Sequence, residues 1–531
     1  MHDYIVIGAG SAGSVLAARL SEDAGTQVAL IEAGGEDKSL FIHLPAGLAV
    51  LAKLGLHAWG QATEPQPGLG GRRGHQPRGK GLGGSSAINA MIYVRGQQAD
   101  YEGWAAQGNP GWDWNSVLPY FLRAENNERG ADAWHGVGGP LNVADLRAPN
   151  PLSRAFVRAC IQAGYEENRD FNGASQEGVG LYQVTQRQGE RHHVAKAYLQ
   201  PHRMRPNLRV ETGARVQRIL FEGRRAVGVE YRQNGSLHQM RCRREVLLCG
   251  GAFLSPQVLM LSGVGPGEHL RAHGIKVLHD LPGVGAHLQD HPDAILVAEG
   301  EKFTDSFGIS LGGGRRLWGA AREWRNQRAG MLTSNFAEAG GFIRSSVEEN
   351  APDLQLHMVA GKLVDHGRKT LWGHGYSVHV CVLRPKSRGS VRLASADPMA
   401  LPLVDPGFYS DPDDMQRMVR GVHCLRSIMA QPALAEYGGQ EMALSAHARS
   451  DAQIEHFIRQ NSDTIYHPVG SCRMGPGPMD VVDAQLCVHG LQGLRVVDAS
   501  IMPSLISGNT NAPTVMIAEK AVDLIRVAEA A

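Results

Sequence analysis

The sequence predicts an α/β fold in which a parallel sheet binds a dinucleotide. Near the start of the chain an apolar run meets Gly8, Gly10 and Gly13 in G-x-G-x-x-G spacing. A helix-forming segment follows, and a second apolar run, 28–31, ends at Glu32. A strand, a glycine turn, a helix and a strand closed by an acid together form the dinucleotide-binding unit.

Each residue of this unit has a physical role. Gly8 permits the tight turn, Gly10 lets the backbone approach a pyrophosphate, and Gly13 lets the helix pack close to the strand. The helix then directs its positive N-terminal end at the phosphates. Glu32 can accept hydrogen bonds from both ribose hydroxyls and would repel a 2′-phosphate. We therefore expect an adenine dinucleotide as ligand.

Composition limits the class of protein. The 531 residues predict two to four domains. Because 53 basic residues face 52 acidic ones, bulk electrostatic binding to nucleic acid is not expected. The sequence contains no apolar run of the roughly 18 residues that a membrane span needs. The first strand begins at Asp3, which leaves no room for a signal peptide, so a cytoplasmic protein is predicted. Seven scattered cysteines without metal-ligand spacing predict reduced thiols and no metal site.

Three later segments resemble parts of the same sheet. Residues 207–231 alternate like two strands joined by a turn, 244–265 repeat the strand, glycine and helix pattern, and 494–503 predict a buried strand. The glycine-rich stretch 79–89 is either a loop between packed elements or a second wall of the dinucleotide site. Residues 300–460 lack these features and predict a separate, substrate-facing domain.

Two long motifs identify a family. GKGLGGSSAINAMIYVRG (79–96) and GAFLSPQVLMLSGVG (251–265) resemble the two signatures of the glucose–methanol–choline (GMC) oxidoreductases, which are FAD-dependent alcohol oxidases and dehydrogenases. HPVG (467–470) and GNTNAPT (508–514) resemble the catalytic segments of that family. Three shorter stretches look closest to bacterial choline dehydrogenases and aliphatic alcohol dehydrogenases: DFNG (170–173), KSRGSVRL (386–393) and TIYHPVGSCRMG (464–475).

The resemblance implies a GMC fold, in which a Rossmann-like FAD-binding domain is joined to a substrate-binding domain of antiparallel sheet and helices. It implies a discontinuous FAD-binding domain of residues 1–155, 200–298 and 462–531. The substrate-binding domain would then comprise residues 156–199 and 299–461.

The resemblance also implies a reaction: oxidation of a primary alcohol to an aldehyde, with hydride transfer to flavin N5 and electrons passed to a quinone-like acceptor. His467 is the implied base, and a neutral imidazole suits that task because its pKa lies near the operating pH. Asn511 is its implied partner, which would donate to the developing alkoxide. Asn511 can equally cap the last helix, and the two roles are compatible. Tyr466 is expected in the substrate pocket, whereas His291 in LQDH is expected to be structural.

Cofactor contacts are implied in the same way. Glu32 would hold the adenosine ribose, the backbone of Val216 the adenine, and Asn89 would lie beside the isoalloxazine. Ile88 stands where some relatives tether FAD through a histidine, which predicts non-covalent FAD. The other implied cofactor residues are Gly8, Gly10, Ser11, Ala12, Gly13, Ala33, Gly79, Gly83, Gly84, Ser85, Ala90, Met91, Gly251, Asp498, Ala499, Asn509, Ala512, Pro513 and Thr514.

The sequence leaves the alcohol and the acceptor open. Choline would need aromatic faces and a carboxylate, for which Glu338 and Tyr466 are candidates. A medium-chain or aromatic alcohol would need only an apolar pocket. We favour a primary alcohol other than choline. Choline dehydrogenase, an oxygen-using alcohol oxidase and a non-redox, FAD-binding hydroxynitrile lyase are the alternatives.

The segment 312–330 has the profile of a helix that lies in a membrane interface. At helical spacing Leu317, Ala321 and Trp324 share a face, and Trp318 lies alongside. Peripheral docking on the inner face of the cell membrane, close to a quinone, is one interpretation. The alternative is packing on a neighbouring domain, with a solvated basic face. The basic residues are Arg315, Arg316, Arg322, Arg325 and Arg328.

Overall fold

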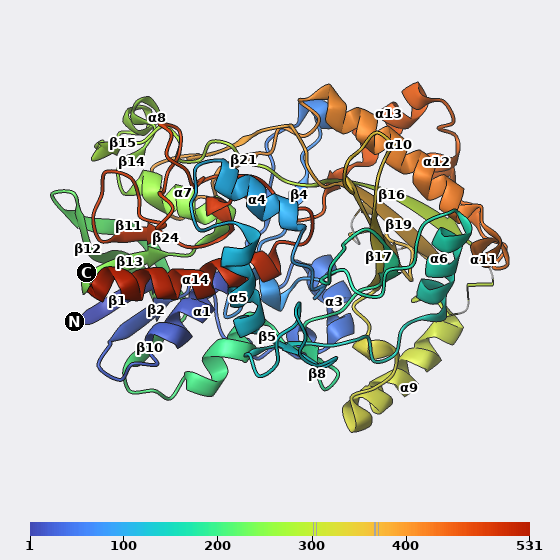
Figure 1. Cartoon of the computed structure of the whole chain (residues 1–531), viewed down its shortest axis with the longest axis horizontal. Coiled ribbons are helices and arrows are strands. Elements are labelled where there is room, and N and C mark those ends of the chain that lie inside the picture. Colours follow the sequence, from blue (N-terminus) through green and yellow to red (C-terminus); the bar gives the residue numbers. More distant parts are fainter. Residues whose placement is uncertain (301, 304, 309, 366–367, 370, 531) are drawn as a thin grey trace.

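The computed structural model describes residues 1–300, 302–303, 305–308, 310–365, 368–369 and 371–530, and contains two large sheets (Figure 1). The first sheet has the strand order β10-β2-β1-β13-β12-β11, with β24 beside β13. The pairs β10–β2, β2–β1, β1–β13 and β13–β24 are parallel, and the rest are antiparallel. Its strands are β1 (His2–Ile7), β2 (Val28–Ile31), β10 (Leu208–Glu211), β11 (Ala214–Glu222), β12 (Arg225–Gln233), β13 (Ser236–Leu248) and β24 (Leu494–Val496).

This sheet confirms that segments distant in the sequence build one nucleotide-binding layer. All four residues of β2 are buried, as expected of a parallel strand covered on both faces. Helices α1 (Ser11–Leu20), α5 (Trp114–Ala124) and α14 (Asn511–Ala530) pack on one another beside the sheet, where α14 crosses the view in red. Helix α7 (Gly251–Leu261) follows β13 and packs against β11.

A buried carboxylate joins these helices. Glu519 on α14 accepts hydrogen bonds from Arg19 of α1 (2.8 Å), Arg123 of α5 (2.9 Å) and the hydroxyl of Tyr198 (2.7 Å). Its side chain is fully buried, so these three donors replace the water that the charge loses. Glu519 thereby fixes the last helix, and with it the segment 508–514 that precedes and begins that helix.

The second sheet is antiparallel, in the order β22-β16-β19-β18-β17-β7 with β23 beside β16. Its central strands are buried along their whole length. Helices α6 (Pro151–Gln162), α10 (Pro412–Met429) and α13 (Asp451–Asn461) pack with it around a second core. Its strands are β7 (Gly178–Leu181), β16 (Pro292–Glu299), β17 (Ala337–Ile343), β18 (Leu354–Val359), β19 (Gly375–Val382), β22 (Gln440–Glu441) and β23 (Asp463–Thr464).

The second sheet differs from the expected division of the chain. Residues up to 298 were expected in the FAD-binding part, yet β16 pairs with β19 in the second sheet. Strand β23, which the division placed with the FAD-binding part, pairs with β16. After β7, the chain therefore re-enters the second sheet directly after His291 and leaves it for the last time just before Ile465. The segments that carry His291 and His467 therefore adjoin the second sheet.

Shorter elements connect these layers. They are α2 (Leu40–His43), η1 (Pro45–Gly47), α3 (Leu48–Leu54), β3 (Gln61–Ala62), η2 (Pro67–Leu69), β4 (His75–Gln76), η3 (Gly84–Ala87), α4 (Gln98–Ala106), β5 (Glu125–Asn127), β6 (Leu141–Val143), β8 (Gln186–Arg187), β9 (Glu190–Arg191), η4 (Ala195–Leu199), η5 (Gln200–His202), β14 (Val264–Gly265), α8 (Gly267–Ala272), β15 (His279–Asp280), α9 (Leu311–Gln327), η6 (Met331–Thr333), β20 (Ser390–Arg392), β21 (Leu403–Asp405), α11 (Pro432–Ala435), α12 (Ala443–Ala446) and η8 (Ala499–Ile501).

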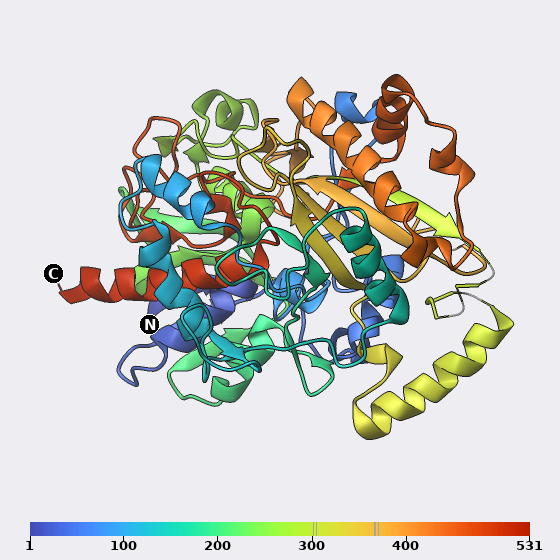
Figure 2. The same cartoon turned by 45° about the vertical axis from the view of Figure 1, so that its right-hand side comes forward.

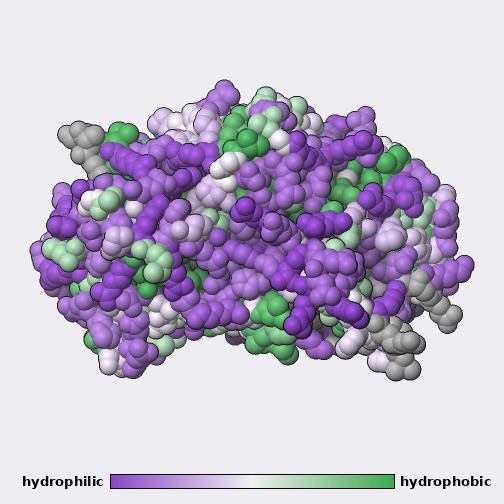
Figure 3. All heavy atoms as spheres, turned by 90° about the horizontal axis from the view of Figure 1, so that it is seen from below, coloured by the Kyte–Doolittle hydropathy of each residue, from purple (hydrophilic) through white to green (hydrophobic). Residues whose placement is uncertain are grey.

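Helix α9 projects from the body of the molecule in both cartoon views (Figures 1 and 2). Trp324 is its anchor: the ring is buried and Nε1 donates to the carbonyl oxygen of Gly189 at 2.8 Å. The face of the molecule in Figure 3 is mostly hydrophilic, and apolar side chains gather there in separate patches. Across the described ranges, none of the helices combines the length and apolar character that crossing a membrane requires.

Candidate active site

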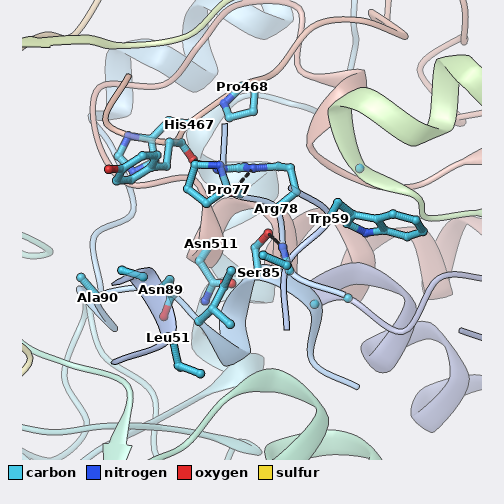
Figure 4. A pocket seen from close by; sticks show the side chains of 18 of the residues that line it. Leu51, Trp59, Pro77, Arg78, Ser85, Asn89, Ala90, His467, Pro468 and Asn511 are labelled. Atoms are coloured by element: carbon cyan, nitrogen blue, oxygen red, sulfur yellow. Dashed lines mark hydrogen bonds between the residues drawn. The ribbon is translucent and has the colours of Figure 1, made fainter. Parts of the chain in front are cut away.

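A cavity of about 600 Å³ runs from the N-terminal glycine turn to the second sheet. In Figure 4, Asn511, Ser85 and Asn89 lie on one side of it and His467 on the other, with Pro77 and Arg78 between. Of the expected site residues, Gly13, Gly83, Ala512 and Pro513 do not line this cavity. Those that do are Gly8, Gly10, Ser11, Ala12, Glu32, Ala33, Gly79, Gly84, Ser85, Asn89, Ala90, Met91, Val216, Gly251, Tyr466, His467, Asp498, Ala499, Asn509, Asn511 and Thr514.

The glycine turn leaves room for an anion. A Cβ on Gly8 would lie 2.6 Å from the carbonyl oxygen of Cys249, and one on Gly13 would lie 1.8 Å from that of Gly8, so both positions need glycine. A Cβ on Gly10 would meet nothing within 4 Å, because it would point into open space. Helix α1 begins immediately after Gly10, so its unpaired N–H groups border that space.

A second helix N-terminus lies beside the first. Ser11, the first residue of α1, donates a hydrogen bond to Oδ1 of Asn511, the first residue of α14, at 2.7 Å. Both residues line the cavity. The positive ends of the two helix dipoles therefore meet at this side of the cavity, which suits a diphosphate and an electron-rich flavin.

Glu32 ties the two glycine-rich loops together. Its carboxylate accepts from the backbone N–H groups of Ala9 (2.8 Å), Gly34 (2.7 Å) and Gly81 (3.0 Å). Burial raises the pKa of Glu32, and these three donors oppose that shift. Two carboxylate oxygens offer about four acceptor sites, and the three backbone donors use three of them. One site therefore remains to accept a hydrogen bond from a ribose hydroxyl.

Arg191 supports the loop that carries Asn89, and the sequence reasoning missed it. The side chain is fully buried, and its Nη1 donates to the backbone oxygen (2.6 Å) and Oδ1 (2.9 Å) of Asn89. Its Nε donates to the carbonyl oxygen of Ile42 at 2.9 Å. Burial lowers the pKa of Arg191 to about 9. A single arginine outside any motif gives no signal of this role in the sequence.

At the other side of the cavity, two chain segments run antiparallel and bring two histidines together. The bridge of Gln289 with Val469 and the pairing of Pro292 with Thr464 fix the register. His291 and His467 lie between these two pairs, with Nδ1 atoms 3.0 Å apart. His291 was expected to be structural, and the structure places its ring directly against that of the implied base.

The hydrogen bonds of His291 determine which nitrogen of His467 carries the proton. His291 Nε2 lies 2.9 Å from the carbonyl oxygen of Leu383, which can only accept, so Nε2 carries a hydrogen. Burial lowers the pKa of His291 to about 4, so the ring is neutral at physiological pH and its Nδ1 is an acceptor. His467 must then donate from Nδ1, so that its Nε2 carries the lone pair that can accept a proton.

The surroundings of His467 favour its neutral form. The pKa of His467 is lowered well below its usual value, first by burial and then by His291, His357 and Arg78. Arg78 is half-buried and donates to the carbonyl oxygen of Tyr466 at 2.8 Å. Tyr466 has a φ of +77°, a strained backbone conformation that places its side chain in the cavity wall beside the base.

One carboxylate holds the backbone of both histidines. Asp290 Oδ1 accepts from the backbone N–H groups of His291 and His467, each at 2.9 Å. Its Oδ2 accepts from the hydroxyl of Thr464 at 2.6 Å. Burial raises the pKa of Asp290 to about 6.

The amide that contacts His467 belongs to Asn509, and this corrects the expected partner. Asn509 Nδ2 lies 3.1 Å from His467 Nε2, and its Oδ1 accepts from Gln355 at 3.1 Å. Asn511 points instead to Ser11 at the N-terminus of α1. The expected partner lies two positions later in the chain than the residue that makes the contact. Asn511 is the first residue of α14, whereas Asn509 lies in the turn before it and faces the second sheet.

Glu338 does not reach the cavity. Its carboxylate is buried and accepts from Ser334 (2.5 Å), from the backbone N–H of Asn150 (2.6 Å) and from Ser153 (2.8 Å). Among the described residues that line the cavity, the carboxylates are those of Glu32 and Asp498, both near the glycine turns. Asp498 accepts from the backbone N–H of Gly251 at 2.8 Å.

The fold and the cavity together are those of a dinucleotide-binding oxidoreductase. The description "GMC oxidoreductase" matches residues 2–293 and 385–518. An alcohol dehydrogenase [acceptor] of Pseudomonas putida is 47% identical over 99% of this chain and 96% of its own length. An oxygen-dependent choline dehydrogenase of Chromohalobacter salexigens is 45% identical over 99% of this chain and 94% of its own. The chain belongs to the GMC oxidoreductase family.

Solved structures agree with this fold. Pyridoxine 4-oxidase from Mesorbium loti superposes with a TM-score of 0.88 at 32% identity, over 98% of this chain and 99% of its own. An FAD-dependent oxidoreductase from Chaetomium thermophilum gives a TM-score of 0.91 at 27% identity, over the full length of both chains. The family and these neighbours imply FAD. The open space at Gly10, the paired helix N-termini and the acceptor sites of Glu32 fit that cofactor.

The two asparagines should separate cofactor binding from chemistry. We expect Asn511→Ala to lower the amount of FAD retained after desalting, because Asn511 joins the two helix N-termini. Asn509→Ala should retain FAD but slow anaerobic flavin reduction by about 10²–10³-fold, the usual effect of removing a donor to a developing oxyanion. Flavin absorbance per chain and stopped-flow reduction rates measure the two effects. Slow reduction in Asn511→Ala with full FAD, and a normal rate in Asn509→Ala, would restore the original assignment.

Proposed function

We propose that this protein oxidises a primary alcohol to an aldehyde. The observation that carries the proposal is the orientation of His467: the hydrogen bonds that run from the Leu383 carbonyl through His291 leave its Nε2 with a lone pair that can accept a proton. Asn509 Nδ2 lies 3.1 Å from this nitrogen. The alcohol loses a proton from its hydroxyl and a hydride from its carbon. FAD, when bound, supplies the acceptor for the hydride.

The residues around the alcohol have distinct roles in this proposal. His467 Nε2 accepts the hydroxyl proton, and Asn509 Nδ2 donates to the oxygen as its negative charge develops. The N-terminus of α14 directs its positive end at the same region. Asp290 and His291 hold His467 in position but do not themselves meet the substrate.

Contacts within the protein support an uncharged alcohol rather than choline. A quaternary ammonium group needs aromatic faces together with a carboxylate for its charge. Glu338, the expected carboxylate, is bound to Ser334, Asn150 and Ser153 away from the cavity. The two carboxylates among the described lining residues, Glu32 and Asp498, lie where the cofactor would bind. Choline oxidation is the second candidate, favoured by the choline dehydrogenase relatives.

We further propose that FAD is held non-covalently. Ile88 lines the cavity at the position where a tethering histidine would stand, and an aliphatic side chain cannot form that bond. Acid precipitation that leaves yellow FAD in the supernatant supports this, and flavin in the washed pellet contradicts it.

For the acceptor we propose a quinone-like molecule at a membrane to which α9 docks. The middle of α9 presents Trp318 (77% exposed) and Leu317 (53% exposed), with arginines on the exposed surface of the same helix. Trp324 was expected on the membrane-facing side of the helix, but it packs into the body of the protein. Leu317 and Trp318 are therefore the residues that would contact the membrane. The described basic side chains are Arg316, Arg322, Arg325 and Arg328; that of Arg315 lies outside the described residues.

The proposed reaction is tested by anaerobic mixing with primary alcohols. The wild-type flavin should bleach, and His467→Ala should bleach about 10²–10⁴-fold more slowly while it keeps its FAD, the usual contribution of a positioned base. A protein whose flavin stays yellow with every alcohol would fit the lyase alternative. Fast reoxidation by air after bleaching would instead place it with the oxidases.

The role of His291 gives a prediction with a matched pair of variants. His291→Gln offers an amide oxygen to His467 Nδ1 and an amide N–H to Leu383, so flavin reduction should stay close to the wild-type rate. His291→Leu removes both contacts, and we expect the rate to fall by about 10–10²-fold, part of the contribution of a positioned base. Because His467 has a lowered pKa and is neutral above it, the wild-type rate should not fall between pH 8 and pH 6.

Flavin absorbance per chain shows whether these variants keep the cavity intact. Equal rates in His291→Leu and His291→Gln, or a wild-type rate that halves near pH 6.5, would exclude this role for His291.

Membrane docking is tested with vesicles. Wild-type protein should co-sediment with anionic vesicles at low salt, and the double variant Leu317→Ser, Trp318→Ala should lose most of this binding. Val527→Ser on α14 is the control, because it changes an equally exposed apolar residue on the helix that ends at the opposite side of the molecule in Figure 1. Binding that is unchanged in the double variant, or absent in the wild type, would rule out docking through α9.

A further inference from the structure

A second pocket, of about 400 Å³, shares no lining residue with the cavity of the active site. Its wall is formed by β5, β6 and the loop between them, by β8, and by the segment that runs from the end of β9 into η5. The described lining residues include no carboxylate. They include four basic side chains, which are Arg187, His192, Lys196 and His202. This wall has the composition of a site for an anion.

The amide groups in the wall of the second pocket are already paired. Asn126 Nδ2 donates to Oδ1 of Asn142 at 2.7 Å, and Asn126 Oδ1 accepts from the backbone N–H of Gly138 at 2.9 Å. Asn142 Nδ2 donates to Glu128 (2.8 Å) and to the carbonyl oxygen of Gln186 (2.7 Å). Both amide oxygens thus have a donor, and the groups left for a ligand are the donors of the basic side chains.

His192 is one of these donors. The residue is 5% exposed, and its Nδ1 accepts from the backbone N–H of Asn142 at 3.2 Å. Burial, followed by the charges of Lys196 and Arg187, lowers the pKa of His192 to about 3, so the ring is neutral and its hydrogen is on Nε2. Nε2 makes no hydrogen bond within the described ranges, and it is not among the unpaired side-chain atoms that are closed to solvent. A ligand in the pocket can therefore contact this N–H group.

Two cations accompany His192. Arg187 is exposed, and its guanidinium has no hydrogen-bond or ion-pair partner in the described part of the chain. Lys196 is bound to Glu190 at 2.7 Å, but Glu190 is shared with Arg328 at 2.9 Å. Because an ammonium group has three donors, Lys196 can bind a ligand and keep this contact. Two cations and one neutral N–H suit the several acceptor oxygens of a phosphate group.

The chain at the end of β9 faces the second pocket with one side and the cofactor loop with the other. Successive side chains of an extended chain point in opposite directions. His192 lines the pocket, whereas Arg191 before it is bound to Asn89. His193 after it packs against the same loop, since a Cβ on Gly83 would lie 2.6 Å from its Nδ1. A ligand that holds His192 in place therefore also stabilises the two contacts with the cofactor loop.

We propose that the second pocket binds a phosphate group, either as free phosphate or as part of a small metabolite, and that bound phosphate slows the release of FAD. Arg187, Lys196 and the Nε2–H of His192 would hold the phosphate. Its effect on FAD would pass through Arg191 and His193 to the cofactor loop. The inference goes beyond the proposed function, because it does not depend on which alcohol is oxidised.

Binding is measured by isothermal titration calorimetry of the FAD-loaded protein with inorganic phosphate, at an ionic strength held constant with sodium chloride. The wild type should bind one phosphate per chain. Arg187→Gln and Lys196→Met should each weaken binding at least about tenfold, because each removes a hydrogen bond between charged groups. Arg232→Gln is the matched control, since Arg232 is an exposed arginine on β12 that does not line the pocket. It should bind phosphate as the wild type does.

A second titration distinguishes the two sources of phosphate. Ribose 5-phosphate has the same phosphate group attached to an organic part. Tighter binding of ribose 5-phosphate than of inorganic phosphate would indicate that a phosphorylated metabolite occupies the pocket. Weaker binding would indicate free phosphate.

The effect on the cofactor is measured as the rate at which FAD fluorescence appears after dilution of the protein. Saturating phosphate should slow this release at least about fivefold in the wild type, a usual coupling between two sites. Arg187→Gln should release FAD at the same rate with and without phosphate. A general stabilising effect of phosphate as a salt would slow both proteins alike.

The outcomes separate this inference from alcohol oxidation. Absence of binding heat in the wild type, together with a melting temperature that phosphate raises equally in wild type and Arg187→Gln, would overturn the phosphate site. Equal affinity in the wild type and both pocket variants would overturn it too. Binding that leaves FAD release unchanged would disprove the link to the cofactor loop. None of these results affects the anaerobic reduction by alcohols, which tests the proposed function by itself.

Discussion

The site depends on one interaction: a single carboxylate oxygen of Asp290 accepts from the backbone of both His291 and His467. These two hydrogen bonds join the segment that ends at His291 to the segment of His467, which lies 176 residues later in the sequence. Both segments also pair with each other, and this pairing continues into strands β16 and β23 of the second sheet. A shift of one residue in this register would turn His467 away from His291 and from the cavity. The orientation of the base is therefore a consequence of how these two segments pair.

The sequence predicted the first sheet well because its signals are local. The glycine turn, the apolar runs and Glu32 lie within one short segment, and steric requirements at Gly8 and Gly13 leave few alternatives. The boundary of the second sheet was not predictable in the same way. Residues 292–299 form an apolar strand that fits either sheet, and its partner β19 lies about 80 residues later. Only the tertiary pairing decides where such a strand belongs.

The same difference between local sequence signals and tertiary contacts explains which candidate site residues the sequence predicted. His467 and most cofactor residues lie in motifs, and the structure places them around one cavity. Asn509 was included as a cofactor residue, but its contact with His467 depends on where α14 begins, which shifts the expected partner by two positions. His291 was set aside because a buried histidine in a turn gives no sign of its neighbour. Arg191 had no signal at all, since the role of an isolated polar residue in a strand depends on which residues lie opposite it.

The proposed mechanism must also explain why a base with a lowered pKa is effective. Burial keeps His467 neutral and ready to accept a proton, yet it also weakens its affinity for that proton. The contact with His291 offsets this loss of proton affinity while the proton is being transferred. As His467 gains positive charge, its Nδ1–H becomes a stronger donor to the lone pair of His291, and the Asn509 amide becomes free to bond the substrate oxygen. Both interactions are stronger in the transition state than in the ground state, which is the condition for an interaction to accelerate the reaction. The neutral histidine pair therefore serves catalysis through the hydrogen bond between its rings as well as through the base itself.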